Sequence, residues 1–271
     1  MFDDAKTIQR MAPRLQRVLI VDPSAASARM MADLMRNLVQ CQVWIAPDTR
    51  KGLALTESVG AQIVFVELSG PGVDGVEFTR KLRRSTVPCR QAPVVVTTAT
   101  ATAQAILGAR DAGVHEFLRK PFTTKDLLRR LEAVTLRQRD WIEAVAYIGP
   151  DRRRFNSGDY SGPLKRRSDT EKTTDAARID QALKILRSAV AAVASDPIQA
   201  LRAMQAQAVD LQKAAVSISD PKLAAATADF QRYLAAVAAR SAPFSAQEVA
   251  TQAASLLALL PDDPDARTAA A

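Results

Sequence analysis

Short apolar runs and longer amphipathic stretches alternate along the first half of the chain. Five runs rich in Val, Ile and Phe predict β-strands at Val18–Val21, Gln42–Ala46, Ile63–Glu67, Val94–Thr97 and Glu116–Arg119. In the stretches between them, apolar positions recur at three- and four-residue spacing. These stretches predict helices over about 24–38, 49–58, 75–84, 101–112 and 123–145. Continuous apolar strands separated by helices are typical of a parallel sheet buried on both faces. We therefore predict a doubly wound α/β domain with a five-stranded parallel sheet over residues 15–145.

The pattern changes after residue 171. Alanine and other aliphatic residues recur there at helical spacing, and glycine is absent from 172–271. Three breaks interrupt the pattern, at Asp196-Pro197, Asp220-Pro221 and Ser241-Ala242-Pro243. Because proline is well tolerated in the first turn of a helix, each break marks the start of a new one. We predict a small all-α domain of three helices and a short fourth over 172–260, followed by a disordered tail over 261–271.

The segment between the two domains, 146–171, is polar and lacks apolar periodicity. The whole chain carries 37 Lys+Arg against 29 Asp+Glu, a formal net charge of +8. Six of these cations lie in the sixteen residues from Arg152 to Arg167, together with a single acid, Asp159. Such a block beside Gly and Pro predicts an arginine-rich linker rather than the face of a helix.

Several classes of protein are disfavoured by composition. The two cysteines lie in unrelated contexts and there is one histidine, His115, so neither a disulfide framework, a zinc cluster nor a two-histidine site is expected. His115 is interpreted as a structural residue, partly exposed in a turn. No apolar run approaches the ~20 residues of a membrane span, and the charged start does not resemble a signal peptide. We expect a soluble, cytoplasmic protein, and one that is not an enzyme, since no nucleophile–base pair or phosphate-cradling glycine loop is present.

Four motifs of the first domain carry a family resemblance. They are Arg17–Asp22, Pro71–Gly75, Pro93–Ala99 and Lys120–Phe122. In this order and spacing they resemble the CheY-like receiver domain of response regulators, with its flavodoxin-like fold. The resemblance implies a phosphoacceptor site at the carboxyl ends of the strands and a switch aromatic beside it. The site would consist of Asp22, Glu67, Thr98 and Lys120, and the switch aromatic would be Phe117.

The acceptor site departs from the family's pattern at two positions. Pro23 stands where a second carboxylate is expected, and Glu67 stands at the position of the acceptor aspartate. Mg²⁺ needs several oxygen ligands, and in-line phosphoryl transfer depends on positioning, so the extra methylene of Glu67 is damaging. We expect no Mg²⁺ and no control by aspartyl phosphorylation. Two interpretations of Glu67 remain open: it imitates a phosphoryl group toward Lys120, or it is part of a leftover ion-paired cluster.

The arginine-rich linker contains an eight-residue repeat. Tyr147-Ile-Gly-Pro-Asp-Arg-Arg-Arg154 is followed thirteen residues later by Tyr160-Ser-Gly-Pro-Leu-Lys-Arg-Arg167. Arginine pairs bidentately with phosphate, bonds the edge of guanine and stacks on aromatic faces, while tyrosine offers a face to a base. A carboxylate or amide three residues after an arginine can accept from guanine. The ligand indicated is anionic, guanine-bearing and two-fold repetitive, as cyclic di-GMP is.

This combination resembles the Cle proteins, cyclic di-GMP effectors in which an arginine-rich tail follows a receiver-like domain. The resemblance implies a ligand site formed by Tyr147, Arg152, Arg153, Arg154, Asn156, Tyr160, Arg166, Arg167 and Asp169. It also implies a protein partner in flagellar motility or surface attachment, and recruitment to the cell pole or flagellar base. The alanine-rich helices after the tail depart from that family's pattern.

Two other functions are weighed against the effector. A degenerate receiver could act only as a protein–protein adaptor in two-component signalling, but a simple tether does not need a repeated Tyr-x-Gly-Pro. Nucleic-acid binding is disfavoured because no recognised reading module is present and the last hundred residues are net neutral. The helical domain has no histidine and is therefore not a histidine phosphotransfer domain. It either packs on itself or on the first domain, or it mediates dimerisation or partner docking through its alanine-lined faces.

Overall fold

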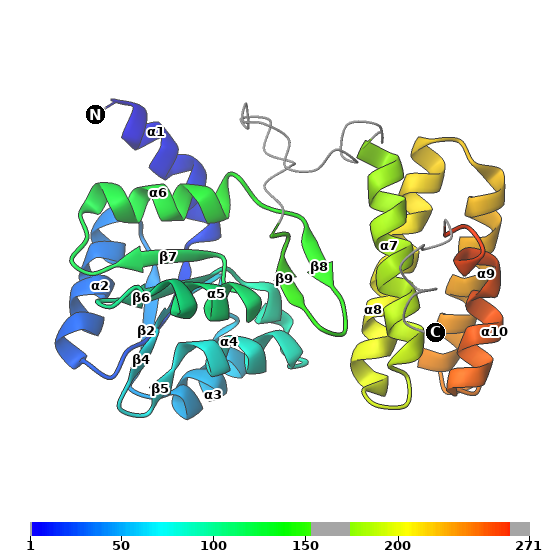
Figure 1. Ribbon diagram of the computed structural model, residues 1–271. Helices are drawn as coiled ribbons and strands as arrows, with labels where there is room; N and C mark the ends of the chain where they lie inside the picture. The colour runs from blue at the N-terminus through cyan, green and yellow to red at the C-terminus, as the bar shows by residue number, and fades with distance from the viewer. Residues whose placement is uncertain (1, 153–173, 261–271) are drawn as a thin grey trace. The chain divides into compact units, whose positions relative to one another are not determined.

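The computed structural model describes residues 2–152 and 174–260 and divides the chain into two compact units. The first unit comprises Met1–Ile142 with Tyr147–Gly158, and the second comprises Glu143–Ala146 with Asp159–Ala271. The two units, shown in Figure 1, are therefore not separated by one boundary at residue 145. Instead the short segment Glu143–Ala146 belongs with the helices, and the residues after it return to the first unit.

The first unit is built on the predicted five-stranded parallel sheet. Its strand order is β2-β1-β3-β6-β7, with neighbours paired in parallel. The strands are β1 (Arg17–Val21), β2 (Gln42–Ala46), β3 (Ile63–Glu67), β6 (Val94–Thr98) and β7 (Glu116–Arg119). All five predicted strands are confirmed to within one residue at either end.

Five helices connect the strands. They are α2 (Ala25–Leu38), α3 (Thr49–Val59), α4 (Gly75–Arg84), α5 (Ala103–Asp111) and α6 (Thr124–Thr135). Each begins after a Ser, Asp or Thr whose side chain accepts from a backbone N–H of the first turn. The prediction was wrong for the last helix, which ends at Thr135 rather than at residue 145.

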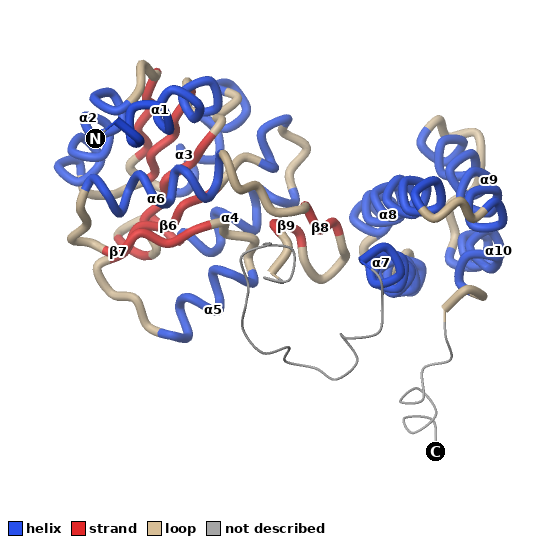
Figure 2. Tube along the Cα trace, turned by 90° about the horizontal axis from the view of Figure 1, so that it is seen from above, coloured by secondary structure: helices blue, strands red, loops and turns tan. Residues whose placement is uncertain are grey.

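Alternate residues of the strands supply two separate apolar cores, one on each face of the sheet. On one face Ile20 and Phe65 pack with Met31 of α2 and Leu131 of α6. On the other face Val21 and Val66 pack with residues of α4 and α5. Figure 2 shows the sheet between these helix layers. Burial of both faces explains why the strand sequences are continuously apolar.

Three features of the first unit were not predicted. A helix, α1 (Phe2–Met11), precedes the sheet and lies beside α6, with Met11 fully buried in the core under α6. A two-residue hairpin, β4 (Ser69–Gly70) with β5 (Val73–Asp74), follows β3. A second hairpin pairs β8 (Trp141–Glu143) with β9 (Ile148–Pro150) where the sequence predicted the end of a helix and the start of a linker.

Two glycines allow β9 to approach the loop after α5 closely. A Cβ on Gly113, which has φ of +92°, would lie 2.2 Å from the carbonyl oxygen of Ile148. A Cβ on Gly149 would lie 2.6 Å from the Cα of Gly113. Gly149 therefore serves a contact between two backbones, and Gly149-Pro150 lies within a strand rather than in the open bend that the repeat suggested.

Arg83 connects the segments around the contact between Gly113 and β9. Its side chain is almost fully buried and donates to the carbonyl oxygens of Gly113, Arg90 and Ala92. Its guanidinium also lies 5.2 Å from the ring centre of Trp141 in β8. Burial lowers the pKa of Arg83 to about 9, so the group remains charged at neutral pH and its charge is stabilised by backbone carbonyl dipoles.

His115 is a structural residue, as expected, and lies beside Arg83. Its Nδ1 is 3.2 Å from an Arg83 nitrogen and accepts from the backbone N–H of Val94 at 3.3 Å. Burial lowers the pKa of His115 well below its ordinary value, and the charges of Arg83 and Arg139 lower it further. His115 is therefore neutral at physiological pH and acts only as an acceptor at Nδ1.

The second unit is the predicted four-helix domain. Its helices are α7 (Thr174–Ala191), α8 (Pro197–Ser217), α9 (Pro221–Ala238) and α10 (Ala246–Leu257). Consecutive helices pack on one another and α10 returns to α7, which closes a ring around an alanine-rich core containing Phe230 and Leu211. Pro197 and Pro221 occupy first turns as predicted. No helix among the described residues is long and apolar enough to span a membrane, and 261–271 lies outside those residues.

Residues from the tip of the β8–β9 hairpin complete the second unit. Glu143 is buried, and its carboxylate accepts from Gln199 Nε2 of α8 at 2.9 Å. Gln207 Nε2 donates to the backbone carbonyl of Glu143 at 3.1 Å, and Val145 packs against the apolar core. These hydrogen bonds satisfy a buried charge and two buried amides, so residues 143–146 are part of this fold rather than a linker.

Candidate functional site

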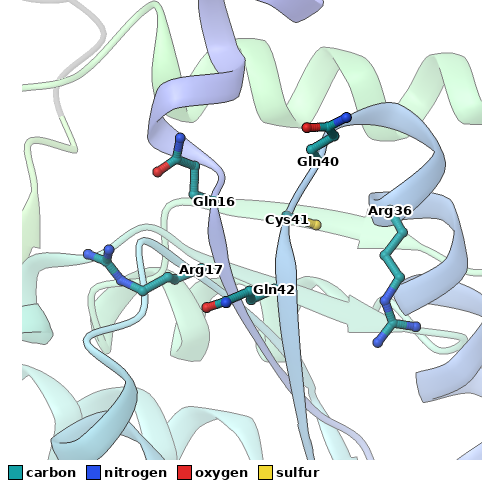
Figure 3. Close-up of a pocket in the computed structure, with 6 residues that line it drawn as sticks. All are labelled: Gln16, Arg17, Arg36, Gln40, Cys41 and Gln42. Atoms are coloured by element: carbon teal, nitrogen blue, oxygen red, sulfur yellow. The ribbon is translucent and has the colours of Figure 1, made fainter.

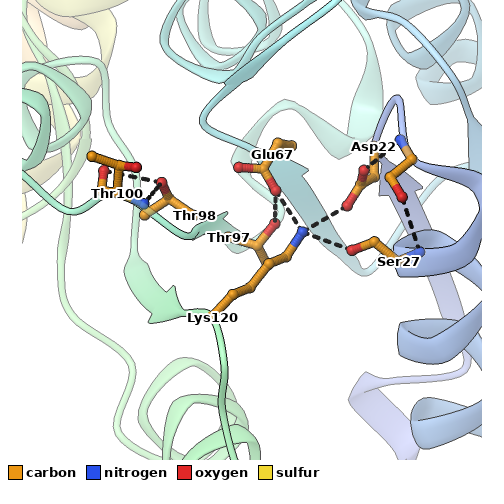
Figure 4. A network of polar contacts seen from close by, with 8 residues as sticks. Asp22, Ser27, Glu67, Thr97, Thr98, Thr100 and Lys120 are labelled. Carbon is orange, nitrogen blue, oxygen red and sulfur yellow. Dashed lines mark hydrogen bonds and ion pairs between the residues drawn. The ribbon is translucent and has the colours of Figure 1, made fainter.

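Three sequence-predicted residues meet at the carboxyl ends of the central strands. Lys120 Nζ donates to Glu67 Oε2 at 2.6 Å, to Asp22 Oδ2 at 2.9 Å and to Ser27 Oγ at 2.7 Å. Figure 4 shows the ammonium between the two carboxylates. All three hydrogens of the ammonium therefore have an oxygen partner. Ser27 was missed by sequence reasoning, although it lies in the first turn of the helix that follows Asp22.

The fold brings these groups together because parallel strands end at one edge of the sheet. Asp22 directly follows β1, Glu67 is the last residue of β3, and Lys120 follows β7. The Lys120-Pro121 peptide is cis. Asp22 is also held from its own loop, since its Oδ1 accepts from the backbone N–H of Ser24 at 2.8 Å. Each partner of Lys120 is thus positioned by a different element.

The charge of Lys120 is strongly stabilised in this arrangement. Burial of the ammonium opposes its charge, but hydrogen bonds and attraction from Glu67 and Asp22 outweigh that effect and raise the pKa of Lys120. The side chains of Asp22, Glu67 and Lys120 are 6%, 13% and 21% exposed, so water screens the contacts little. The site is a largely desolvated cluster of two anions and one cation.

The residues present do not fit a magnesium ion. The two carboxylates already bind the ammonium of Lys120. Pro23, which stands where a carboxylate next to Asp22 is expected, contributes no side-chain oxygen. The cavity lined by Asp22, Ser27, Thr97 and Lys120 measures about 10 Å³. Pro23 is also fixed against the β4–β5 hairpin, because a Cβ on Gly70 would lie 2.7 Å from its ring. No group of three potential metal-ligating side chains occurs within residues 2–152 or 174–260.

Neither Thr98 nor Phe117 makes a described hydrogen bond to the cluster. Thr98 is buried, and its hydroxyl donates to the carbonyl oxygen of Thr100 and accepts from the N–H of the same residue. The neighbouring Thr97, which sequence reasoning did not select, donates to Glu67 Oε2 at 3.4 Å. Phe117 is half-buried and packs against the core under α4 and α5.

The described part of the first repeat copy belongs to the first unit. Tyr147 donates through its hydroxyl to the carbonyl oxygen of Pro150 at 2.6 Å. The Arg152 guanidinium lies 3.6 Å from the centre of the Tyr147 ring and pairs with Asp111 Oδ1, at the end of α5, at 2.7 Å. Tyr147 and Arg152 thus lie together, and each has a partner within the unit. Asp111 was missed, since nothing in its local sequence marks it.

The remaining predicted ligand residues lie outside the described residues. They are Arg153, Arg154, Asn156, Tyr160, Arg166, Arg167 and Asp169. Their role in ligand binding stays a prediction from the sequence.

A polar cleft of about 530 Å³ lies at the opposite, amino-terminal ends of β1 and β2. Figure 3 shows the residues that line it, which are Gln16, Arg17, Arg36, Gln40, Cys41 and Gln42. None of them is a site residue predicted from the sequence. Arg17 Nε is held by the carbonyl oxygen of Gly60 at 2.8 Å, and Arg36 lies near Asp33. Burial raises the pKa of the Cys41 thiol, which is therefore not activated.

Comparison with known families finds a match for part of the first unit. Residues 18–132 match the family model of the response regulator receiver domain. These residues form a receiver domain. The receiver thus accounts for the sheet and its connecting helices up to α6, while the β8–β9 hairpin and α7–α10 lie outside the matched region.

Two curated relatives match less than half of the chain each. The chemotaxis protein CheY of Pseudomonas aeruginosa is 28% identical over 118 residues, which cover 44% of this chain and 94% of CheY. The DNA-binding response regulator MtrA of Mycolicibacterium paratuberculosis is 31% identical over 126 residues, which cover 46% of this chain and 53% of MtrA. The chain thus spans about half the length of MtrA. The solved structure of Vibrio cholerae CheY4 is 23% identical, with a TM-score of 0.42, and covers 44% of this chain and 98% of that one.

Proposed function

We propose that the chain is a non-catalytic cyclic di-GMP effector whose receiver domain is not controlled by phosphorylation. The duplicated Tyr-x-Gly-Pro-x-Arg/Lys-Arg-Arg element carries this proposal. Two copies of one arginine–tyrosine element suit a ligand with two guanines and two phosphates. The ligand residues within it are those named in the sequence analysis, and the resemblance to Cle proteins implies a partner in flagellar motility or surface attachment.

The contacts of Tyr147 and Arg152, in the described part of the first repeat copy, support this proposal. Arg152 stacks on the Tyr147 ring and pairs with the Asp111 carboxylate. These are the two kinds of contact that a guanine base and a phosphate offer to arginine. An arginine already engaged in both can exchange its internal partners for those of a nucleotide.

The geometry of the acceptor position supports the second half of the proposal. Glu67 binds Lys120 at 2.6 Å without any added phosphoryl group, and the residues around it do not suit Mg²⁺. We propose that this contact holds the receiver in one state permanently. In acetyl phosphate with Mg²⁺, mass spectrometry should show no adduct at Glu67, and a Mg²⁺-dependent adduct would contradict this part of the proposal.

Calorimetry tests the ligand directly. Cyclic di-GMP is titrated into the wild type and into an Arg153→Ala/Arg166→Ala double variant, which removes one equivalent arginine from each copy. We expect micromolar or tighter binding by the wild type and at least tenfold weaker binding by the variant, since each arginine–phosphate contact is charge-assisted. An Arg29→Ala/Arg50→Ala variant is the matched control, because it removes the same charge from exposed positions of the receiver. No wild-type binding, or equal loss in both variants, would reject the proposal.

Nucleic-acid binding is the alternative that the comparisons bring forward. The MtrA relatives are described as DNA-binding, although the match covers 46% of this chain and 53% of MtrA. Titration of duplex DNA under the same conditions separates the two functions. The effector should bind cyclic di-GMP and show only weak, salt-sensitive association with DNA.

Size-exclusion chromatography with light scattering, with and without ligand, tests a homodimer formed through the helical unit.

A further inference from the structure

We propose that Asp111 is an internal competitor that holds Arg152 of the first repeat copy until an anionic ligand displaces it. This inference rests on the proposed function and adds a regulatory contact to it. Asp111 is the last residue of α5, and Arg152 follows β9, so the contact links the arginine element to a helix of the receiver domain.

The geometry gives Arg152 two partners that imitate those of a nucleotide. The Asp111 carboxylate, 2.7 Å from Arg152 Nη1, takes the place of a phosphate oxygen. The Tyr147 ring, 3.6 Å from the guanidinium carbon, takes the place of a base. Tyr147 in turn is fixed by its hydrogen bond to Pro150. The face of Tyr147 that stacks with Arg152 is therefore covered, and a guanine can reach it only after Arg152 has moved.

The docked state of Arg152 is incomplete, which makes its displacement feasible. Arg152 Nε is buried and has no hydrogen-bond acceptor among the described residues. Arg152 Nη2 reaches only the backbone oxygen of Asp111, at 3.4 Å. Asp111 also has a second cation near it, since Arg110 Nε lies 3.5 Å from its Oδ1. A phosphate with several free oxygens can satisfy more of the guanidinium than this contact does.

The competition predicts that weakening the internal contact strengthens ligand binding. Asp111→Asn keeps the shape of the side chain and removes its charge. Because the side chains of Arg152 and Asp111 are 31% and 48% exposed, their ion pair is moderate in strength, and we expect cyclic di-GMP to bind about two- to fivefold more tightly. Glu57→Gln is the matched control, because it removes one exposed carboxylate from the same unit at a position without a described partner.

A double-mutant cycle and a ligand-free measurement complete the test. In an Arg152→Ala background, Asp111→Asn should no longer change the affinity. Without ligand, trypsin should cleave after Arg152 faster in Asp111→Asn than in the wild type or in Glu57→Gln. Unchanged affinity and unchanged cleavage in Asp111→Asn would overturn the inference while leaving the proposed function intact. Absence of binding in every variant would reject the proposed function and this competition with it, whatever the cleavage result shows.

Discussion

Lys120 is the residue that makes the degenerate acceptor site stable. Its ammonium separates two carboxylates that would otherwise repel each other in a largely desolvated position. Because the pKa of Lys120 is raised above its ordinary value, this stabilisation is complete at neutral pH and is lost only as the pH rises through that elevated pKa. With Pro23 and Glu67 in place, both carboxylates of the site therefore have Lys120 as their counter-ion.

Replacement of Lys120 by methionine should expose this dependence. Lys120→Met leaves Asp22 and Glu67 without a counter-ion, and we expect a loss of about 1–3 kcal/mol in the free energy of unfolding at neutral pH. Urea titration at about pH 7.5 measures the loss. Lys125→Met, at an exposed position of α6, is the control, and an equal loss in both variants would contradict the role of Lys120.

Residue types with a chemical signature were predictable, but their partners were not. Asp22, Glu67 and Lys120 could be placed together because each stands at the carboxyl end of a recognisable strand. Ser27 and Thr97 carry no such signature, and their hydroxyls join the cluster only through the register of the fold. Asp111 and Arg152 are 41 residues apart in the sequence, and no local pattern connects them.

Among the elements, the β8–β9 hairpin departs most from the sequence expectation. Its strands have three residues each, too few for a period-two pattern to appear, and Trp141 and Ile142 continue the apolar spacing of α6. The long strands and helices were predictable because their periodicity extends over many residues. Helix α1 was not predicted, because the charged first residues were compared only with the pattern of a signal peptide and not with that of a helix.

The backbone approach at Gly113 offers a test of how this hairpin is held. Gly113→Ala places a Cβ 2.2 Å from the Ile148 oxygen, on a residue with positive φ. It should lower the free energy of unfolding by about 1–3 kcal/mol. Gly108→Ala is the matched control, because a Cβ there meets no atom within 4 Å and the residue lies inside α5. The control should gain up to about 1 kcal/mol. Thermal unfolding of the wild type and the two variants measures both effects. An unchanged stability of Gly113→Ala would show that the hairpin does not depend on this contact.

At the scale of the whole molecule, the chain contains separate cores that share no residue. The receiver cores lie on the two faces of the sheet, and the helical core is formed by α7–α10 together with Val145. Glu143–Ala146 belongs to the helical unit although the chain on both sides of it belongs to the receiver unit. Each unit should therefore respond to its own substitutions, because energetic coupling falls off between residues that do not share neighbours.

Two core substitutions test this independence. Phe65→Ala in β3 and Phe230→Ala in α9 each remove a ring that is 1% exposed, and each should cost about 3–5 kcal/mol in its own unit. Differential scanning calorimetry of the full chain should show Phe65→Ala lowering one transition and Phe230→Ala the other. In the double variant the two losses should add to within about 0.5 kcal/mol. A single transition lowered by either substitution would mean that the two units unfold together, so that ligand-induced changes in one would be felt throughout the other.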